Sequence, residues 1–210
     1  MSYPLRNDAL TLYAITDRYW LNGSRLADVV ENVLKNGATF LQLREKEFSH
    51  EEMVQEAMEI KEIAARYRVP FVINDDIYAA KEIDADGVHI GQSDMEYQKA
   101  RQILGPDISA STLEEAVAAE KAGADYIGVG AVFPTDTKAD HIPVTFEELK
   151  QITDTVSIPV VAIGGINADN LTKLAGTGID GISVISAIFG QPDPGIATKE
   201  LLARTKEILS

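Results

Sequence analysis

An amide and two cations occupy alternate positions of the stretch FLQLREKEF, residues 40–48. Successive side chains of an extended strand point to opposite faces, so Gln42, Arg44 and Lys46 share one face and the leucines take the other. A core strand that gathers positive charge at its end is suited to hold an anion. The simpler interpretation is that these cations form ion pairs with nearby carboxylates, which are common at strand ends and contribute little to stability.

Two carboxylates are expected near these cations. Asp75 follows the apolar run FVIN (71–74), and Asp94 follows GVHIG (87–91). If the two runs are neighbouring strands, about 4.8 Å apart, the carboxylates lie close together and must share a proton, pair with cations or hold a metal. With oxygen donors only, Mg²⁺ is the natural candidate, because proteins hold it with one or two carboxylates plus substrate phosphates. A metal flanked by these cations predicts a diphosphate site.

Two further segments carry groups that suit anions. FPTDTKADHIPV (133–144) lacks apolar periodicity and is longer than a usual connection, which favours a binding loop. AIGGINADN (162–170) and SVISAIF (183–189) place glycines and a serine after apolar runs, where backbone N–H groups often hold phosphate, although close packing would also explain the glycines. Two anion sites predict two phosphorylated substrates.

Eight apolar runs alternate with helical patterns such as residues 50–67 and 112–122. Most runs are apolar on both faces, as parallel strands covered by helices must be. Residues 1–210 are therefore predicted to form a single α/β domain, a small TIM (β/α)8 barrel, with a doubly wound open sheet as the alternative. In a barrel the carboxyl ends of the strands form the active site, where all the polar residues above are expected to converge.

Composition excludes several classes of function. The 210 residues include no cysteine, which rules out disulfides and thiolate sites. A net charge of −14 argues against nucleic acid and anionic membrane as partners, and no run approaches the roughly 20 apolar residues of a membrane span. A cytoplasmic protein is expected. None of the three histidines lies beside a serine in a recognisable triad, and the acidic helices suit either solvated surface or a homo-oligomer interface.

Six motifs, taken together and in order, resemble thiamine-phosphate synthase: QLREK (42–46), IND (73–75), GVHIGQSD (87–94), GVGAVFPTDTK (128–138), AIGGI (162–166) and VIS (184–186). The resemblance implies a transferase that joins 4-amino-2-methyl-5-hydroxymethylpyrimidine diphosphate to 4-methyl-5-(2-phosphooxyethyl)thiazole, giving thiamine phosphate and pyrophosphate.

The resemblance also implies site residues. Asp75 and Asp94 would bind Mg²⁺. The pyrimidine diphosphate would be held by Gln42, Arg44, Lys46, Asn74, Ser109 and Lys138, with Arg44, Lys46 and Lys138 as the catalytic cations. The thiazole phosphate would be held by Thr135, Thr137, Gly165, Ile185 and Ser186, and the same motifs add Leu43, Glu45 and Asp136 to the substrate-binding set.

Two departures from the family pattern leave alternatives open. The fifth apolar run, in GPDISAST (105–112), is short, so the fifth strand is expected to be truncated or shifted, and Asp76 follows the Asn-Asp pair where an arginine is common. A thiazole tautomerase-like relative would keep the thiazole phosphate site without the diphosphate and metal groups. A non-catalytic sensor of thiamine phosphate is a third interpretation.

Overall fold

Eight short parallel strands close into a barrel in the computed structural model, which describes residues 8–90, 106–135 and 143–210, with residues 106–109 described by their backbone alone. Each strand pairs with its neighbours in chain order, and β8 pairs with β1. The closed barrel confirms the predicted fold and rules out the open sheet. The strands are β1 (Leu12–Ile15), β2 (Phe40–Leu43), β3 (Phe71–Asn74), β4 (Gly87–Ile90), β5 (Pro106–Ala110), β6 (Ile127–Val129), β7 (Val160–Ile163) and β8 (Gly181–Val184).

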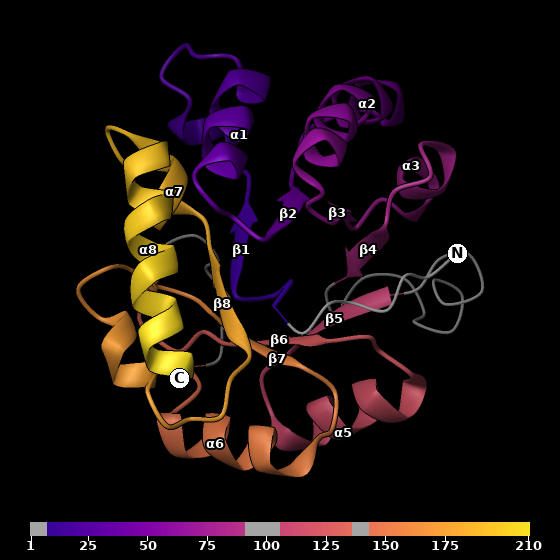
Figure 1. Ribbon diagram of the computed structural model, residues 1–210. Helices are drawn as coiled ribbons and strands as arrows, with labels where there is room; N and C mark the ends of the chain where they lie inside the picture. The colour runs from indigo at the N-terminus through magenta and orange to yellow at the C-terminus, as the bar shows by residue number, and fades with distance from the viewer. Residues whose placement is uncertain (1–7, 91–105, 136–142) are drawn as a thin grey trace.

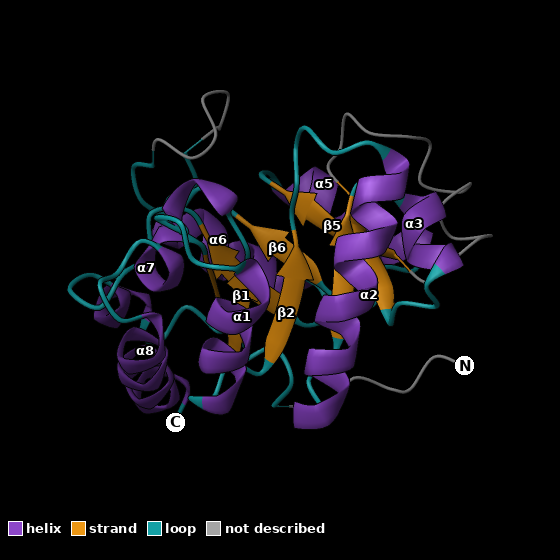
Figure 2. Ribbon diagram, turned by 90° about the horizontal axis from the view of Figure 1, so that it is seen from above, coloured by secondary structure: helices purple, strands orange, loops and turns teal. Residues whose placement is uncertain are grey.

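Helices surround the strands as an outer layer (Figure 1). Seen from above, β2 is visible between α1 and α2 (Figure 2). The α-helices are α1 (Leu26–Lys35), α2 (His50–Tyr67), α3 (Ile77–Glu82), α5 (Leu113–Ala122), α6 (Phe146–Thr155), α7 (Ser186–Phe189) and α8 (Pro194–Leu209), and the 3₁₀ turns are η1 (Arg18–Trp20) and η2 (Leu171–Leu174). None of the helices in the described part of the chain is long and apolar enough to span a membrane.

Local signals set the helix boundaries. Ser49 accepts a hydrogen bond from the Glu52 backbone N–H, and the Glu52 carboxylate accepts one from the Ser49 backbone N–H, which forms a capping box at the start of α2. At the carboxyl end of α5, Gly123 adopts a φ of 89°, a left-handed conformation that glycine takes without steric cost. The helix predicted over residues 50–67 is confirmed.

Two apolar layers result from the alternation of the strands. Leu41 and Leu43 belong to the core between strands and helices, whereas Phe40 packs inside the barrel with Tyr13 and Tyr126. The expected opposition between Gln42 and the leucines is therefore real. Phe40 and Gln42 therefore point into the barrel, and Gln42 is the nearer of the two to the rim at the carboxyl end of the strands.

The fifth strand is continuous, which corrects the expectation that it is truncated or shifted. Residues Pro106–Ala110 pair with β4 on one side and with β6 on the other. Ser109 lies opposite Gly128 in that register. Strand pairing on both sides stabilises a segment whose own sequence is a weak strand signal. That residues 1–210 form a single domain stays a prediction.

Candidate functional site

The carboxyl end of β2 presents the amide and the two cations. Gln42 is only 1% exposed, and its Nε2 donates a hydrogen bond to the Tyr13 hydroxyl. Arg44 is half-buried, and its backbone N–H donates to Thr16 Oγ1 at 2.9 Å, while Lys46 is exposed. Of the carboxylates that the structure describes, none lies within the 4.0 Å ion-pair distance of Arg44 or Lys46. The simpler ion-pair interpretation is therefore not supported by these carboxylates.

Leu43 and Glu45 belong to the same stretch but point elsewhere. The Leu43 side chain is fully buried in the core beneath the helices. The Glu45 side chain is 6% exposed, and its Oε1 lies 3.2 Å from Arg18 Nη2. Burial raises the pKa of Glu45, and the nearby Arg18 partly opposes that rise. A substrate contact from either residue would have to come from its backbone.

Asn74 and Asp75 continue the rim at the end of β3. The Asn74 amide donates a hydrogen bond to Asp75 Oδ2, and the Asp75 backbone N–H donates to the His89 carbonyl at 2.8 Å. Asp75 has a φ of 63°, in the left-handed region that a non-glycine residue seldom adopts. Its exposed carboxylate thus follows a sharp turn directly after the strand. Such strained positions cluster at functional sites.

The segments after β6 and β7 are fastened to one another. The Val132 N–H donates to the Ile163 carbonyl at 3.0 Å, and the Phe133 N–H donates to the Gly164 carbonyl at 3.1 Å. A Cβ built on Gly165 would lie 2.3 Å from the Pro134 carbonyl oxygen. This close approach sets Pro134, the residue before the half-buried Thr135, against the Gly164–Gly165 turn.

The end of β8 supplies the last described part of the predicted site. Ile185 is half-buried and packs against the cluster inside the barrel, and Ser186 is exposed at the first position of α7. Because all strands are parallel, the ends of β2, β3, β6, β7 and β8 face the same side of the barrel. The remaining predicted site residues lie outside the described residues or lack a described side chain: Asp94, Ser109, Asp136, Thr137 and Lys138. The proximity of Asp75 to Asp94 thus stays a prediction.

A buried polar network inside the barrel was not predicted from the sequence. Tyr126 donates a hydrogen bond to the Tyr13 hydroxyl at 3.0 Å, and the same hydroxyl accepts from Gln42. His89, 8% exposed on β4, stacks against the Tyr126 ring at 6.4 Å between centroids. The signal in the sequence that could have indicated this network is Tyr13, which carries a hydroxyl between the aliphatic residues of β1. This network fixes Gln42 from below the rim.

His50 links α2 to α3 next to this rim, and its titration gives a test. Its Nε2 lies 3.0 Å from Glu82 Oε2 and its Nδ1 lies 3.3 Å from Asp76 Oδ2, while Asp76 also caps α3. Glu82, followed by Asp76, raises the pKa of His50 above its ordinary 6.5. Protonated His50 therefore stabilises the fold fully below that ordinary value, and the contribution is lost as the pH rises through the raised folded value.

We expect an NMR titration to give His50 a pKa above 6.5. Glu82→Gln should lower that pKa towards the ordinary value, since it removes the larger of the two causes. A wild-type value at or below 6.5 would contradict the link. The contacts also account for Asp76, whose role here is to cap a helix and to bind His50.

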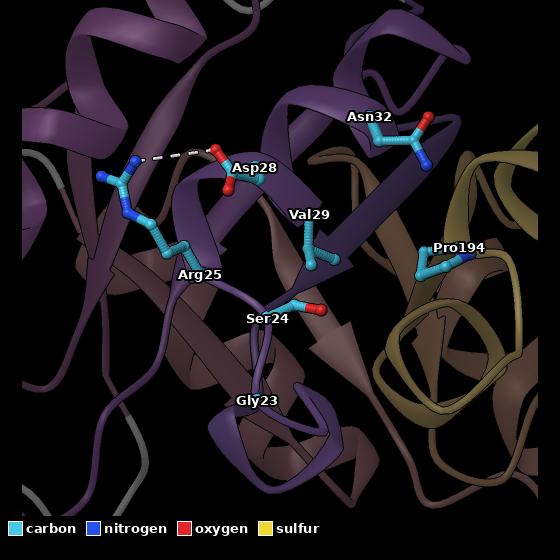
Figure 3. Close-up of a pocket in the computed structure, with 7 residues that line it drawn as sticks. All are labelled: Gly23, Ser24, Arg25, Asp28, Val29, Asn32 and Pro194. Carbon is cyan, nitrogen blue, oxygen red and sulfur yellow. Dashed lines mark ion pairs between the residues drawn. The ribbon is translucent and has the colours of Figure 1, made fainter.

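A surface hollow of about 460 Å³ lies elsewhere, on the outer layer between the starts of α1 and α8 (Figure 3). Arg25 and Asp28 form a 3.8 Å ion pair at its edge. It is lined by α1, the turn before it and Pro194, so it is separate from the rim at the strand ends.

Comparisons with known proteins cover most of the chain. The family model described as thiamine monophosphate synthase matches residues 12–188. A thiamine-phosphate synthase of Clostridium novyi (strain NT) is 52% identical over 195 residues, covering 90% of this chain and 96% of that protein. A second, of Clostridium tetani (strain Massachusetts / E88), is 46% identical over 200 residues, covering 93% and 96%.

A solved structure agrees over nearly the whole chain. The thiamine phosphate pyrophosphorylase of Pyrococcus furiosus superposes with a TM-score of 0.90 at 40% identity, and the match covers 97% of this chain and 99% of that one. The sequence matches and the fold match therefore point to one family. The chain belongs to the thiamine monophosphate synthase family.

Proposed function

We propose that this chain, an enzyme of the transferase class, condenses 4-amino-2-methyl-5-hydroxymethylpyrimidine diphosphate with 4-methyl-5-(2-phosphooxyethyl)thiazole to give thiamine phosphate and pyrophosphate. The observation that carries the proposal is the pair Arg44 and Lys46 at the end of β2. Neither side chain is neutralised by a carboxylate in the described ranges. Two such cations beside the exposed Asp75 suit a polyanion.

The diphosphate side of the site is assigned to β2 and β3. Arg44 offers a planar fork that matches two phosphate oxygens, and Lys46 offers a flexible point charge. Gln42 and Asn74 provide amides for the pyrimidine end of the same substrate. Lys138 and Ser109 complete the set by their place in the matching motifs. Cations that contact the departing diphosphate stabilise the charge that develops on it.

Mg²⁺ is proposed as the cofactor. The donors fit this ion, because Asp75 and Asn74 supply oxygen at the rim and the chain has no cysteine. Proteins usually hold this ion with one or two carboxylates and substrate oxygens. Asp75 and Asp94 would hold it, and when bound it would neutralise charge on the leaving diphosphate.

The thiazole phosphate is assigned to the ends of β6, β7 and β8. The Gly164–Gly165 turn lets backbone approach closely, and Ser186 adds a hydroxyl at the start of α7. Thr135 and Thr137 would face the same phosphate. Ile185 would contact the ring. This assignment would put the two substrates side by side across one barrel mouth, where orientation itself lowers the barrier.

The absence of a general base from this assignment follows from the chemistry. The thiazole nitrogen attacks through a lone pair and carries no proton that must be removed. The chain's own residues therefore have to bind, orient and exclude water, while the cations stabilise the departing anion. A histidine or carboxylate base is not required.

Purified protein mixed with both substrates and Mg²⁺ should release thiamine phosphate and pyrophosphate in equal amounts. EDTA should reduce product to background, and excess Mg²⁺ should restore it. Isomerisation of the thiazole without pyrophosphate release would instead support the tautomerase-like alternative, and binding of thiamine phosphate without turnover would support the sensor. A cytoplasmic location and a homo-oligomeric state stay predictions.

A further inference from the structure

Glu45 is out of place in a row of cations that receives a diphosphate. It lies between Arg44 and Lys46 in the chain, yet its side chain is turned towards η1 and α2 and is 6% exposed. A carboxylate free to move between those two neighbours would pair with one of them and compete with the substrate. Something must hold it away from the rim.

Arg18 is the residue in contact with it. One guanidinium nitrogen, Nη2, lies 3.2 Å from Glu45 Oε1 and 2.8 Å from Glu56 Oε2 of α2. The guanidinium carbon also lies 4.8 Å from the centroid of the Phe48 ring. Burial lowers the pKa of Arg18, but Glu45 and Glu56 raise it by more, so the group stays charged. Arg18 on η1 thus contacts the segment that follows β2 on its side away from the rim.

We propose that Arg18 is a positioning residue, which holds the Glu45 carboxylate on the helix side of the rim and so leaves Arg44 and Lys46 available to the diphosphate. The inference rests on the function proposed above and extends it to a residue outside the predicted site.

The alternative is that Arg18 only tethers the segment mechanically. The backbone of this segment is already held by another residue, because Thr16 Oγ1 accepts from the Arg44 N–H at 2.9 Å and the Thr16 N–H donates to the Gln42 carbonyl at 3.0 Å. Those two bonds do not involve Arg18. What Arg18 adds is positive charge beside an otherwise buried carboxylate, which would be costly to leave unpaired.

Two variants distinguish the effect of the Arg18 charge from that of a mechanical tether. Arg18→Gln removes the cation and leaves the Glu45 carboxyl group without it, whereas Arg18→Gln combined with Glu45→Gln removes both ionisable groups. Arg25→Gln is the matched control, since Arg25 also binds a carboxylate of α2, with Nη2 2.6 Å from Glu59 Oε1, but lies at the outer hollow (Figure 3). Initial rates are measured with each substrate varied in turn.

We expect Arg18→Gln to lower kcat/KM for the pyrimidine diphosphate roughly tenfold, because an unpaired carboxylate then competes for the rim cations. The KM for the thiazole phosphate should change by less than about twofold, since that substrate meets other strands. The double variant should recover most of the loss, and Arg25→Gln should match the wild type. If Arg18→Gln fails to fold by circular dichroism, Arg18→Lys replaces it, with an expected smaller loss.

Two outcomes would overturn the inference: Arg18→Gln as active as Arg25→Gln, or a double variant no better than Arg18→Gln, which is the result a mechanical tether gives. The wild type in the same assay keeps the two proposals apart. If the wild type itself makes no thiamine phosphate, the proposed function fails; if it does, only the role of Arg18 is at stake.

Discussion

Arg44→Ala is expected to lower kcat/KM for the pyrimidine diphosphate by at least about a hundredfold, the usual effect of removing a pre-organised group that stabilises transition-state charge. Arg44 is half-buried at the rim, its backbone is fixed by Thr16, and the described part of the chain offers its side chain no carboxylate. The guanidinium is therefore ready to bind an anion. In the described part of the chain, its side chain forms no ion pair that the substitution would break.

Stability separates this role from a structural one. Arg44→Ala should leave the thermal midpoint unchanged or raise it slightly, because it removes a cation next to Lys46 without breaking a described ion pair. Arg44→Lys keeps the charge but loses the planar fork, so its activity should fall between those of the wild type and the alanine variant.

The control is Arg66→Ala on α2, which breaks a 3.2 Å surface pair with Glu31 and should leave kcat/KM unchanged. A folded Arg44→Ala protein with wild-type kcat/KM would move the diphosphate away from β2. The proposed division of the rim between the two substrates would then fail.

Local sequence predicted much of the fold for identifiable reasons. The helix over residues 50–67 was predicted from its helical pattern, and the Ser49–Glu52 capping box that starts it is equally local. The barrel follows from repetition of one strand and helix pattern. The run around Ser109 was expected to form a truncated or shifted strand because its local signal is weak, whereas its stability comes from pairing with β4 and β6.

The site was predicted in part for the same reason. Alternation along β2 placed Gln42 and Arg44 on one face, since a period of two depends on the strand alone. Which groups those side chains meet depends on contacts that are distant in sequence. The hydroxyl that binds Gln42 belongs to Tyr13, and the cation that binds Glu45 belongs to Arg18. Neither pairing has a signal in the local pattern.

Gly165→Ala is expected to destabilise the fold by more than about 3 kcal/mol, because it combines an unfavourable φ with a backbone clash. Gly165 has a φ of 65°, and its added Cβ would lie 2.3 Å from the Pro134 carbonyl oxygen and 2.8 Å from that of Phe133. Backbone atoms cannot rotate away as a flexible side chain can. The segment that carries Thr135 would have to move, so the variant should also raise KM for the thiazole phosphate.

Gly176→Ala separates the cost of the unfavourable φ from the cost of the backbone clash. Gly176 has a φ of 78°, but an added Cβ would meet nothing within 4 Å, so this variant should lose only the roughly 1–2 kcal/mol of a left-handed side chain. Urea unfolding of both variants gives the comparison, provided that the slope of the transition is unchanged. Equal losses would mean that the segment after β6 yields freely to the turn after β7. Thr135 would then not be held against Gly165, and the phosphate cradle proposed for the thiazole would lose its structural basis.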